Sequence, residues 1–242
     1  MPHEDVTNFD RVDEAGTPER FVTFLDTAFG IEGIKAMKRR TFELLDAEPG
    51  HRILDVGCGT GEDARSLVDL VSPRGNVSAV DVSREMVSEA RKRHGELSES
   101  SLNFSVGDVA ALDFESGVFD ACRIERTLIH VPDPVGAVHE MVRVLRRGGR
   151  LVAFEPDFKT FVVDSAHRQV SRRILSFWVD SFRSEWVACH LPALFQECGM
   201  MDVYVEPRTA ILDFDLAHQL FISGTLERSS DRGWRGDLRG SR

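Results

Sequence analysis

Residues 53–61 read Ile-Leu-Asp-Val-Gly-Cys-Gly-Thr-Gly and are expected to join a buried strand to a glycine-rich turn. The aliphatic and β-branched residues before the first glycine are typical of a strand that is covered on both faces. Gly57, Gly59 and Gly61 occupy every second position, which allows a sharp turn and lets a ligand lie against bare main chain. Residues 64–71 then place apolar side chains at helical spacing. We therefore predict a strand, a glycine-rich loop and a helix.

The spacing of the glycines distinguishes two kinds of nucleotide ligand. Dinucleotide-binding loops read G-x-G-x-x-G and place a pyrophosphate on the helix N-terminus. Here the pattern is G-x-G-x-G, and Glu62 and Asp63 would meet a pyrophosphate with two negative charges. Asp81 ends the next expected strand, twenty residues after Gly61, where a carboxylate hydrogen-bonds ribose hydroxyls. These features favour a ribose-bearing ligand without a pyrophosphate, such as S-adenosylmethionine; a ligand-free turn and a dehydrogenase-like unit are the alternatives.

Further segments strengthen this interpretation and carry a resemblance to a known family. They are residues 80–83 with Met86, residues 107–109, residues 125–134 and residues 144–151. With the glycine-rich loop they span roughly residues 30–160, in a fixed order. The chain resembles the class I S-adenosylmethionine-dependent methyltransferases, and among them the small-molecule enzymes of the ubiquinone/menaquinone C-methyltransferase type. The resemblance implies an α/β fold with a doubly wound, mainly parallel Rossmann-like sheet, helices on both faces, and S-adenosyl-L-methionine as the cofactor.

The remaining pattern predicts how the chain is divided. Residues 1–48 are expected to form an N-terminal helical lid, with helices from Thr17 to Gly30 and from about residue 34 to residue 45. Residues 49–224 would form the cofactor-binding domain, with a helical insertion at about residues 158–198. Beyond the first two strands, we expect strands at residues 102–106, 118–124 and 150–155, with a helix between the last two.

The C-terminal part departs from the family pattern. We expect helices at residues 167–182 and 191–198, a strand near residues 203–212 and a short helix around residues 216–222. The closing strand of the family is expected to be missing, which would leave one edge of the sheet incompletely covered. Residues 225–242 are rich in glycine, arginine, serine and aspartate, a composition that predicts a disordered tail.

The resemblance also assigns roles within the cofactor site. It gives the glycines to the methionine portion and the ribose, Asp81 to the ribose hydroxyls, and Asp108 with Val109 to the adenine. The predicted cofactor-binding residues are Asp55, Gly57, Cys58, Gly59, Thr60, Gly61, Asp81, Val82, Met86, Gly107, Asp108, Val109, Glu125 and Arg126.

Several of these residues have an alternative structural role. Asp55 would be buried and needs a partner, which is either the cofactor's ammonium group or backbone N–H groups of the loop. Asp108 also fits a turn or helix cap, and Met86 fits the apolar core as well as an adenine contact. His130 is the candidate catalytic residue, as a general base near neutral pH; the alternative is that it supports the loop.

The acceptor is expected to be a small, apolar or aromatic molecule methylated on carbon, oxygen or nitrogen. Aromatic side chains that would form a lid over it, or part of the core, are Phe9, Phe21, Phe24, Phe29, Phe158, Phe161, Trp178, Phe182 and Trp186. The alternative function keeps the cofactor site but catalyses another reaction, such as cyclisation, or only binds a partner protein.

Composition narrows the other possibilities. The net charge of −10 argues against a nucleic-acid partner, because a phosphate backbone would be repelled. No apolar run has membrane-spanning length, and the cysteines form no C-x-x-C pair, so we expect a cytoplasmic protein without a membrane partner or a metal site. A homo-oligomer is possible, since a second subunit would cover the open sheet edge.

Overall fold

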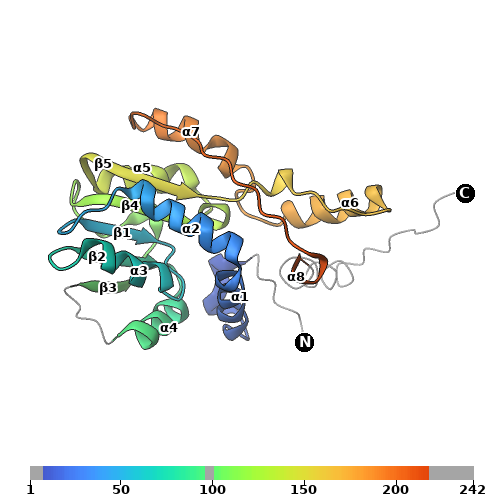
Figure 1. The fold of residues 1–242 in the computed structure, drawn as a ribbon, viewed down its shortest axis with the longest axis horizontal. Helices are drawn as coiled ribbons and strands as arrows, with labels where there is room; N and C mark the ends of the chain where they lie inside the picture. Colours follow the sequence, from blue (N-terminus) through green and yellow to red (C-terminus); the bar gives the residue numbers. More distant parts are fainter. Residues whose placement is uncertain (1–7, 96–100, 218–242) are drawn as a thin grey trace, which may run out of the picture.

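The computed structural model describes residues 8–95 and 101–217, whose centre is a parallel sheet (Figure 1). Its strands are β1 (Arg52–Val56), β2 (Asn76–Asp81), β3 (Leu102–Val106), β4 (Phe119–Glu125) and β5 (Leu145–Phe154). Their order is β3-β2-β1-β4-β5, and all neighbouring pairs are parallel. The predicted Rossmann-like sheet is therefore confirmed. The strand order reverses between β1 and β4, which is where open α/β sheets bind ligands.

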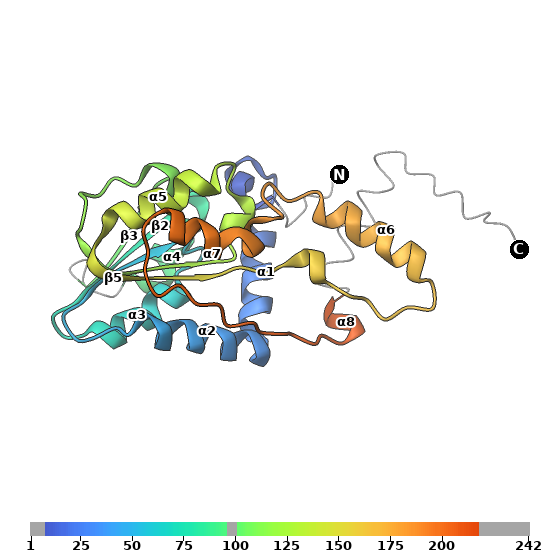
Figure 2. The ribbon, with the colours of Figure 1, turned by 90° about the horizontal axis from the view of Figure 1, so that it is seen from above.

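Helices cover both faces of this sheet. They are α1 (Glu19–Gly30), α2 (Glu32–Leu45), α3 (Glu62–Val71), α4 (Arg84–His94), α5 (Pro134–Val144), α6 (Arg168–Val179), α7 (Val187–Glu197) and α8 (Phe214–Ala217), with 3₁₀ helices η1 (Phe9–Glu14), η2 (Val109–Ala111), η3 (Leu128–His130) and η4 (Phe158–Thr160). α2, α3 and α4 pack on one face, whereas α5 packs on the other and α7 packs against α5 (Figure 2). α6 extends away from the sheet (Figures 1 and 2). No helix in these ranges is long and apolar enough to cross a lipid bilayer.

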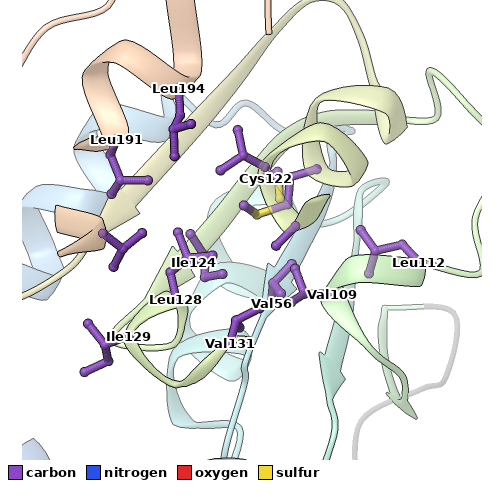
Figure 3. Close-up of a cluster of buried hydrophobic side chains, with 14 of the residues drawn as sticks. Val56, Val109, Leu112, Cys122, Ile124, Leu128, Ile129, Val131, Leu191 and Leu194 are labelled. Atoms are coloured by element: carbon purple, nitrogen blue, oxygen red, sulfur yellow. The ribbon is translucent and has the colours of Figure 1, made fainter. Parts of the chain in front are cut away.

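The two cores follow from the alternation of side chains along the strands. Ile53 of β1 packs in one core with residues of α2, α3 and α4. Leu54 and Val56 point to the opposite face and pack in the other core with α5 and α7. Figure 3 shows this second core, in which Ile124 of β4 and Leu128 lie near Leu191 and Leu194 of α7.

A group of buried charges sits on the face covered by α2 and α3. Asp55 of β1 and Arg123 of β4 are direct neighbours in the strand register, and each side chain is only 2% exposed. Arg123 contacts Asp55 and Asp63 at 3.1 Å and also contacts Glu125. Lys38 of α2 contacts Asp63, and its Nζ lies 2.9 Å from Glu125 Oε1. These five residues, called the buried charge cluster below, tie α2 and α3 to the sheet.

The C-terminal part corrects one prediction. Residues 203–212 form no strand, and among the described residues β5 pairs only with β4 and is the edge of the sheet. Pro207 interrupts the segment because it has no backbone N–H to donate. Glu206 accepts hydrogen bonds from Arg40 Nε of α2 at 3.0 and 3.1 Å, which holds the segment against α2. The proposed tail at residues 225–242 lies outside the described residues.

Replacing Arg123 tests whether the buried charge cluster stabilises the fold. Arg123→Met is expected to lower the free energy of unfolding by about 3–5 kcal/mol, because it leaves buried carboxylates uncompensated. The matched control is Arg146→Met, which breaks the ion pair between Arg146 and Asp120; the Arg146 side chain is 47% exposed. This control is expected to change the free energy of unfolding by less than about 1 kcal/mol. Urea unfolding measures both, and equal losses in the two variants would contradict this account.

Candidate active site

A large cleft opens at the carboxyl ends of the strands. Its volume is about 2160 Å³, more than the 300–1,000 Å³ typical of a small-molecule site, because it extends from the glycine-rich loop to the exposed side of β5. The predicted cofactor residues that line the cleft are Asp55, Gly57, Cys58, Gly59, Thr60, Asp81, Val82, Gly107, Asp108, Val109, Glu125 and Arg126. His130 lines it as well, whereas Gly61 and Met86 do not. The topology thus brings together most of the residues that the sequence singled out.

The glycine-rich loop depends on backbone conformations that favour glycine. Gly57, Gly59 and Gly61 have φ values of 69°, 51° and 83°. A Cβ on Gly57 would collide with the side chain of Thr127, so the β1 and β4 ends approach each other closely here. A Cβ on Gly61 would lie 2.7 Å from the ring of Phe104, which gives Gly61 a packing role beneath the cleft.

Asp81 holds the loop and also faces the cleft. Its Oδ2 accepts a hydrogen bond from Gly59 N at 2.9 Å, and its Oδ1 accepts one from Ser83 N at 2.9 Å. Burial raises the pKa of this carboxyl, although these N–H groups favour its charged form. Each carboxylate oxygen has a further lone pair, so the geometry leaves acceptor capacity for ribose hydroxyls.

Asp108 and Met86, for which the sequence left a structural role open, lie in different environments. Asp108 is exposed in the cleft, and its Oδ1 also accepts a hydrogen bond from Ala110 N at 2.9 Å, so it caps η2 while facing the site. Met86 is 1% exposed and packs with Val12 and Phe21 in a small core below η1. The structure therefore places Met86 in the core, and it shows Asp108 as a cap of η2 that also lines the cleft.

Asp55 has a different protein partner from those expected. The donor to Asp55 Oδ1 is Arg123 Nη1, at 3.1 Å, and not a backbone N–H group of the loop. Asp55 Oδ2 is buried and has no hydrogen-bond partner among the described residues. Burial raises the pKa of Asp55 to about 6, against the opposing effect of Arg123. A buried acceptor without a donor beside the glycine-rich loop fits the ammonium group of the cofactor's methionine portion.

Sequence reasoning missed the two cations at the bottom of the cleft. Arg123 and Lys38 line the cleft together with Asp63, but neither cation was singled out from the sequence. The available signal was Arg123 itself, a charged residue between the apolar Cys122 and Ile124 of β4, which requires a buried counter-charge. Burial opposes ionisation of Glu125, yet Arg123, Arg126 and Lys38 outweigh it and hold the pKa of this carboxyl well below its usual range.

His130 lies where the cleft becomes aromatic. Its ring centroid is 5.3 Å from that of Phe9 and 5.5 Å from that of Phe182. Phe182 stacks on Phe158 at 5.0 Å, and Trp178 packs edge-on against Phe158 at 4.6 Å. Of the aromatic residues expected to form a lid or part of the core, those that line the cleft are Phe9, Phe24, Phe29, Phe158, Phe161, Trp178 and Phe182.

Glu155 at the end of β5 fixes the loop that carries His130. Its Oε1 accepts hydrogen bonds from Thr127 N at 2.9 Å and Leu128 N at 2.8 Å. Its Oε2 is buried without a hydrogen-bond partner in the described part of the chain. Burial raises the pKa of Glu155 to about 7, although the two N–H groups favour the charged form.

Because Gly57 lies close to Thr127, a side chain added at Gly57 should destabilise the protein more than one added at a glycine with open space around it. Gly57→Ala is expected to cost about 1–3 kcal/mol in backbone strain, and more because of the collision with Thr127. Gly50→Ala is the control, since its φ is also positive, at 99°, but nothing lies within 4 Å of its added Cβ. Thermal unfolding should therefore show a larger loss for Gly57→Ala. Equal losses would mean that the contact with Thr127 is not rigid.

The raised pKa of Glu155 predicts how stability depends on pH. Because the folded-state pKa of about 7 exceeds the ordinary value of 4.5, the folded protein retains a proton that the unfolded chain releases. The contribution of this group to stability is full below pH 4.5 and is lost as the pH rises towards 7. Glu155→Gln should flatten urea-unfolding stability between pH 5 and pH 7, whereas the exposed Glu115→Gln should not. An unchanged slope in Glu155→Gln would refute the assignment.

Comparison with known proteins agrees with this geometry. Residues 54–153 match the family described as a methyltransferase domain. Over 224 residues the chain is 36% identical to an uncharacterized 37.1 kDa protein in transposon TN4556 from Streptomyces fradiae, covering 92% of this chain and 63% of that protein. It is 29% identical over 138 residues to demethylmenaquinone methyltransferase from Bacillus cytotoxicus, covering 57% of this chain and 58% of that enzyme. The chain thus spans less than two thirds of the length of either relative.

Solved structures share the fold. A putative methyltransferase in complex with the Trm112 methyltransferase activator from Haloferax volcanii has a TM-score of 0.58 at 19% identity, over 91% of each chain. A putative methyltransferase from Bacillus halodurans has a TM-score of 0.54 at 20% identity, over 67% of this chain and 68% of that one. Residues 54–153 thus match a methyltransferase domain, and the sequence relatives support its assignment to the class I S-adenosylmethionine-dependent methyltransferases, whereas the solved structures show the shared fold.

Proposed function

We propose that this chain binds S-adenosylmethionine at the switch point between β1 and β4 and transfers its methyl group to a small molecule. The observation that carries the proposal is that Asp81, which accepts a hydrogen bond from Gly59 N of the glycine-rich loop, lines the same cleft as Asp55, whose buried Oδ2 has no hydrogen-bond partner among the described residues. Asp81 would bind the ribose hydroxyls, and Asp55 the ammonium group. When bound, S-adenosylmethionine supplies an electrophilic methyl group with a good leaving group.

The acceptor would occupy the aromatic end of the cleft, and we propose an apolar or aromatic compound. Phe9 and Phe24 from the N-terminal segment line this cleft together with Phe158, Phe161 and Trp178. Aromatic walls exclude water and favour flat or apolar ligands. The residues of this chain would accelerate transfer mainly by holding the acceptor atom in line with the methyl group, since positioning alone lowers such barriers strongly.

His130 is the proposed proton acceptor when the acceptor must lose a proton. It lies beside the aromatic region, on the loop that Glu155 holds in place. An imidazole is suited to this role near neutral pH. In this role, His130→Gln slows methyl transfer only to acceptors that must lose a proton. If His130 instead only supports the loop, the same replacement affects acceptors with and without an acidic proton alike.

Calorimetric titration tests the cofactor site. We expect binding of S-adenosylmethionine and of its demethylated product, S-adenosylhomocysteine. Asp81→Asn should weaken both affinities by about tenfold or more, equivalent to about 1.4 kcal/mol, because it removes a charged hydrogen-bond acceptor of the ribose. Asp69→Asn is the control, since Asp69 lies on the exposed side of α3 with a side chain that is 69% exposed. No binding to the unchanged protein would refute the proposal.

Methyl transfer itself requires a separate measurement. The protein would be incubated with S-adenosylmethionine labelled on the methyl group and with fractions of apolar and aromatic metabolites, and labelled products would be sought by mass spectrometry. Label in a small apolar product supports the proposal. Tight cofactor binding with no transfer to any fraction would favour the alternative, a methyltransferase-like protein that catalyses another reaction, such as a cyclisation, or only binds a partner.

A further inference from the structure

Arg126 adopts a backbone conformation that suits glycine better than arginine. It directly follows β4 and has a φ of 49°, in the left-handed region. Its backbone N donates to Phe154 O at 2.8 Å, so the turn is fixed to the end of β5. A side chain in this region costs about 1 kcal/mol or more relative to glycine, and such residues cluster at functional sites. What arginine adds at this position is its guanidinium group.

The guanidinium of Arg126 has donors that the protein does not use. Its Nε donates to Glu125 Oε1 at 2.9 Å, but among the described residues Nη1 and Nη2 have no acceptor. The side chain is 25% exposed and lines the cleft. The neighbouring cations differ, because Lys38 and Arg123 are buried and each contacts more than one carboxylate.

A guanidinium fork with unused N–H groups recognises a planar anionic oxygen group in two-point contact. Arg126 is adjacent in sequence to Thr127, whose side chain fills the space beside Gly57, and the same loop continues to His130. Along the chain, Arg126 therefore directly precedes the contact with the glycine-rich loop and the segment that carries His130, and all three line the cleft. We infer that the Nη atoms of Arg126 bind an anionic oxygen ligand in the cleft, either the carboxylate of the cofactor's methionine portion or an oxyanion of the acceptor. This inference rests on the proposed function.

Variants of Arg126 separate its backbone from its guanidinium. Arg126→Gln removes the charge and keeps a polar side chain, whereas Arg126→Lys keeps the charge and loses the fork. Arg126→Gly removes the side chain and relaxes the turn, and this gain opposes the loss of the ion pair with the buried Glu125. Arg65→Gln, on the exposed side of α3, is the matched control. Urea unfolding of each variant establishes that it is folded before any ligand is added.

Two pairs of probes distinguish the sources of the anionic group. S-adenosylhomocysteine carries the amino-acid carboxylate, whereas 5′-methylthioadenosine lacks the amino-acid portion. Benzoate and benzamide are then titrated into protein saturated with S-adenosylhomocysteine. If Arg126 binds the cofactor carboxylate, Arg126→Gln and Arg126→Gly lose about ten- to one-hundred-fold in affinity for S-adenosylhomocysteine but not for methylthioadenosine, and Arg126→Lys recovers part of the loss.

If Arg126 binds an acceptor oxyanion, cofactor affinities stay unchanged, and the saturated protein prefers benzoate to benzamide until Arg126 is replaced. The inference is overturned if the variants bind all four probes as the unchanged protein does, or if they lose affinity for S-adenosylhomocysteine and methylthioadenosine equally. An unchanged protein that binds neither nucleoside refutes the proposed function, and this inference with it. The two failures are therefore distinguishable.

Discussion

The cross-strand pair of Asp55 and Arg123 is the interaction on which the buried charge cluster at the bottom of the cleft depends. The parallel register of β1 and β4 places the two residues side by side, on the face covered by α2 and α3. Because both are buried, Arg123 must be neutralised, and Asp63 and Glu125 complete that task. Lys38 extends the same cluster to α2, so an N-terminal helix is held against the residues that line the cleft. A buried charge cluster thus sets the geometry beneath the proposed cofactor.

Above this cluster, the glycine-rich loop and Asp81 form one hydrogen-bonded unit. Asp81 binds Gly59 N and Ser83 N, while Gly57 N donates to Val80 O at 2.7 Å. The ends of β1 and β2 are therefore fixed relative to each other by short contacts. A ligand that reaches both would meet groups that are already in place, which lowers the entropic cost of binding. The aromatic end of the cleft is built from more distant parts of the chain.

Local patterns could be predicted from the sequence, and long-range pairings could not. The strand, the glycine-rich loop and Asp81 depend on neighbours in sequence, so residue spacing was enough to identify them. The partner of Asp55 lies 68 positions away, and only the strand register shows that it is Arg123. The strand expected at residues 203–212 was wrong because β-favouring residues form a strand only where they pair with a neighbouring strand. Pro207, which has no N–H to donate, interrupts such pairing. Met86 fitted two environments equally well until the position of Val12 was known.

The most direct test of the account is a crystal structure of this chain grown with S-adenosylhomocysteine. We expect the ribose hydroxyls within hydrogen-bond distance of Asp81 and the ammonium group next to Asp55 Oδ2, with the buried charge cluster unchanged. Density for the nucleoside away from the glycine-rich loop would contradict it. So would a ligand in the cleft whose ribose faces the aromatic end and leaves Asp81 without a ligand contact.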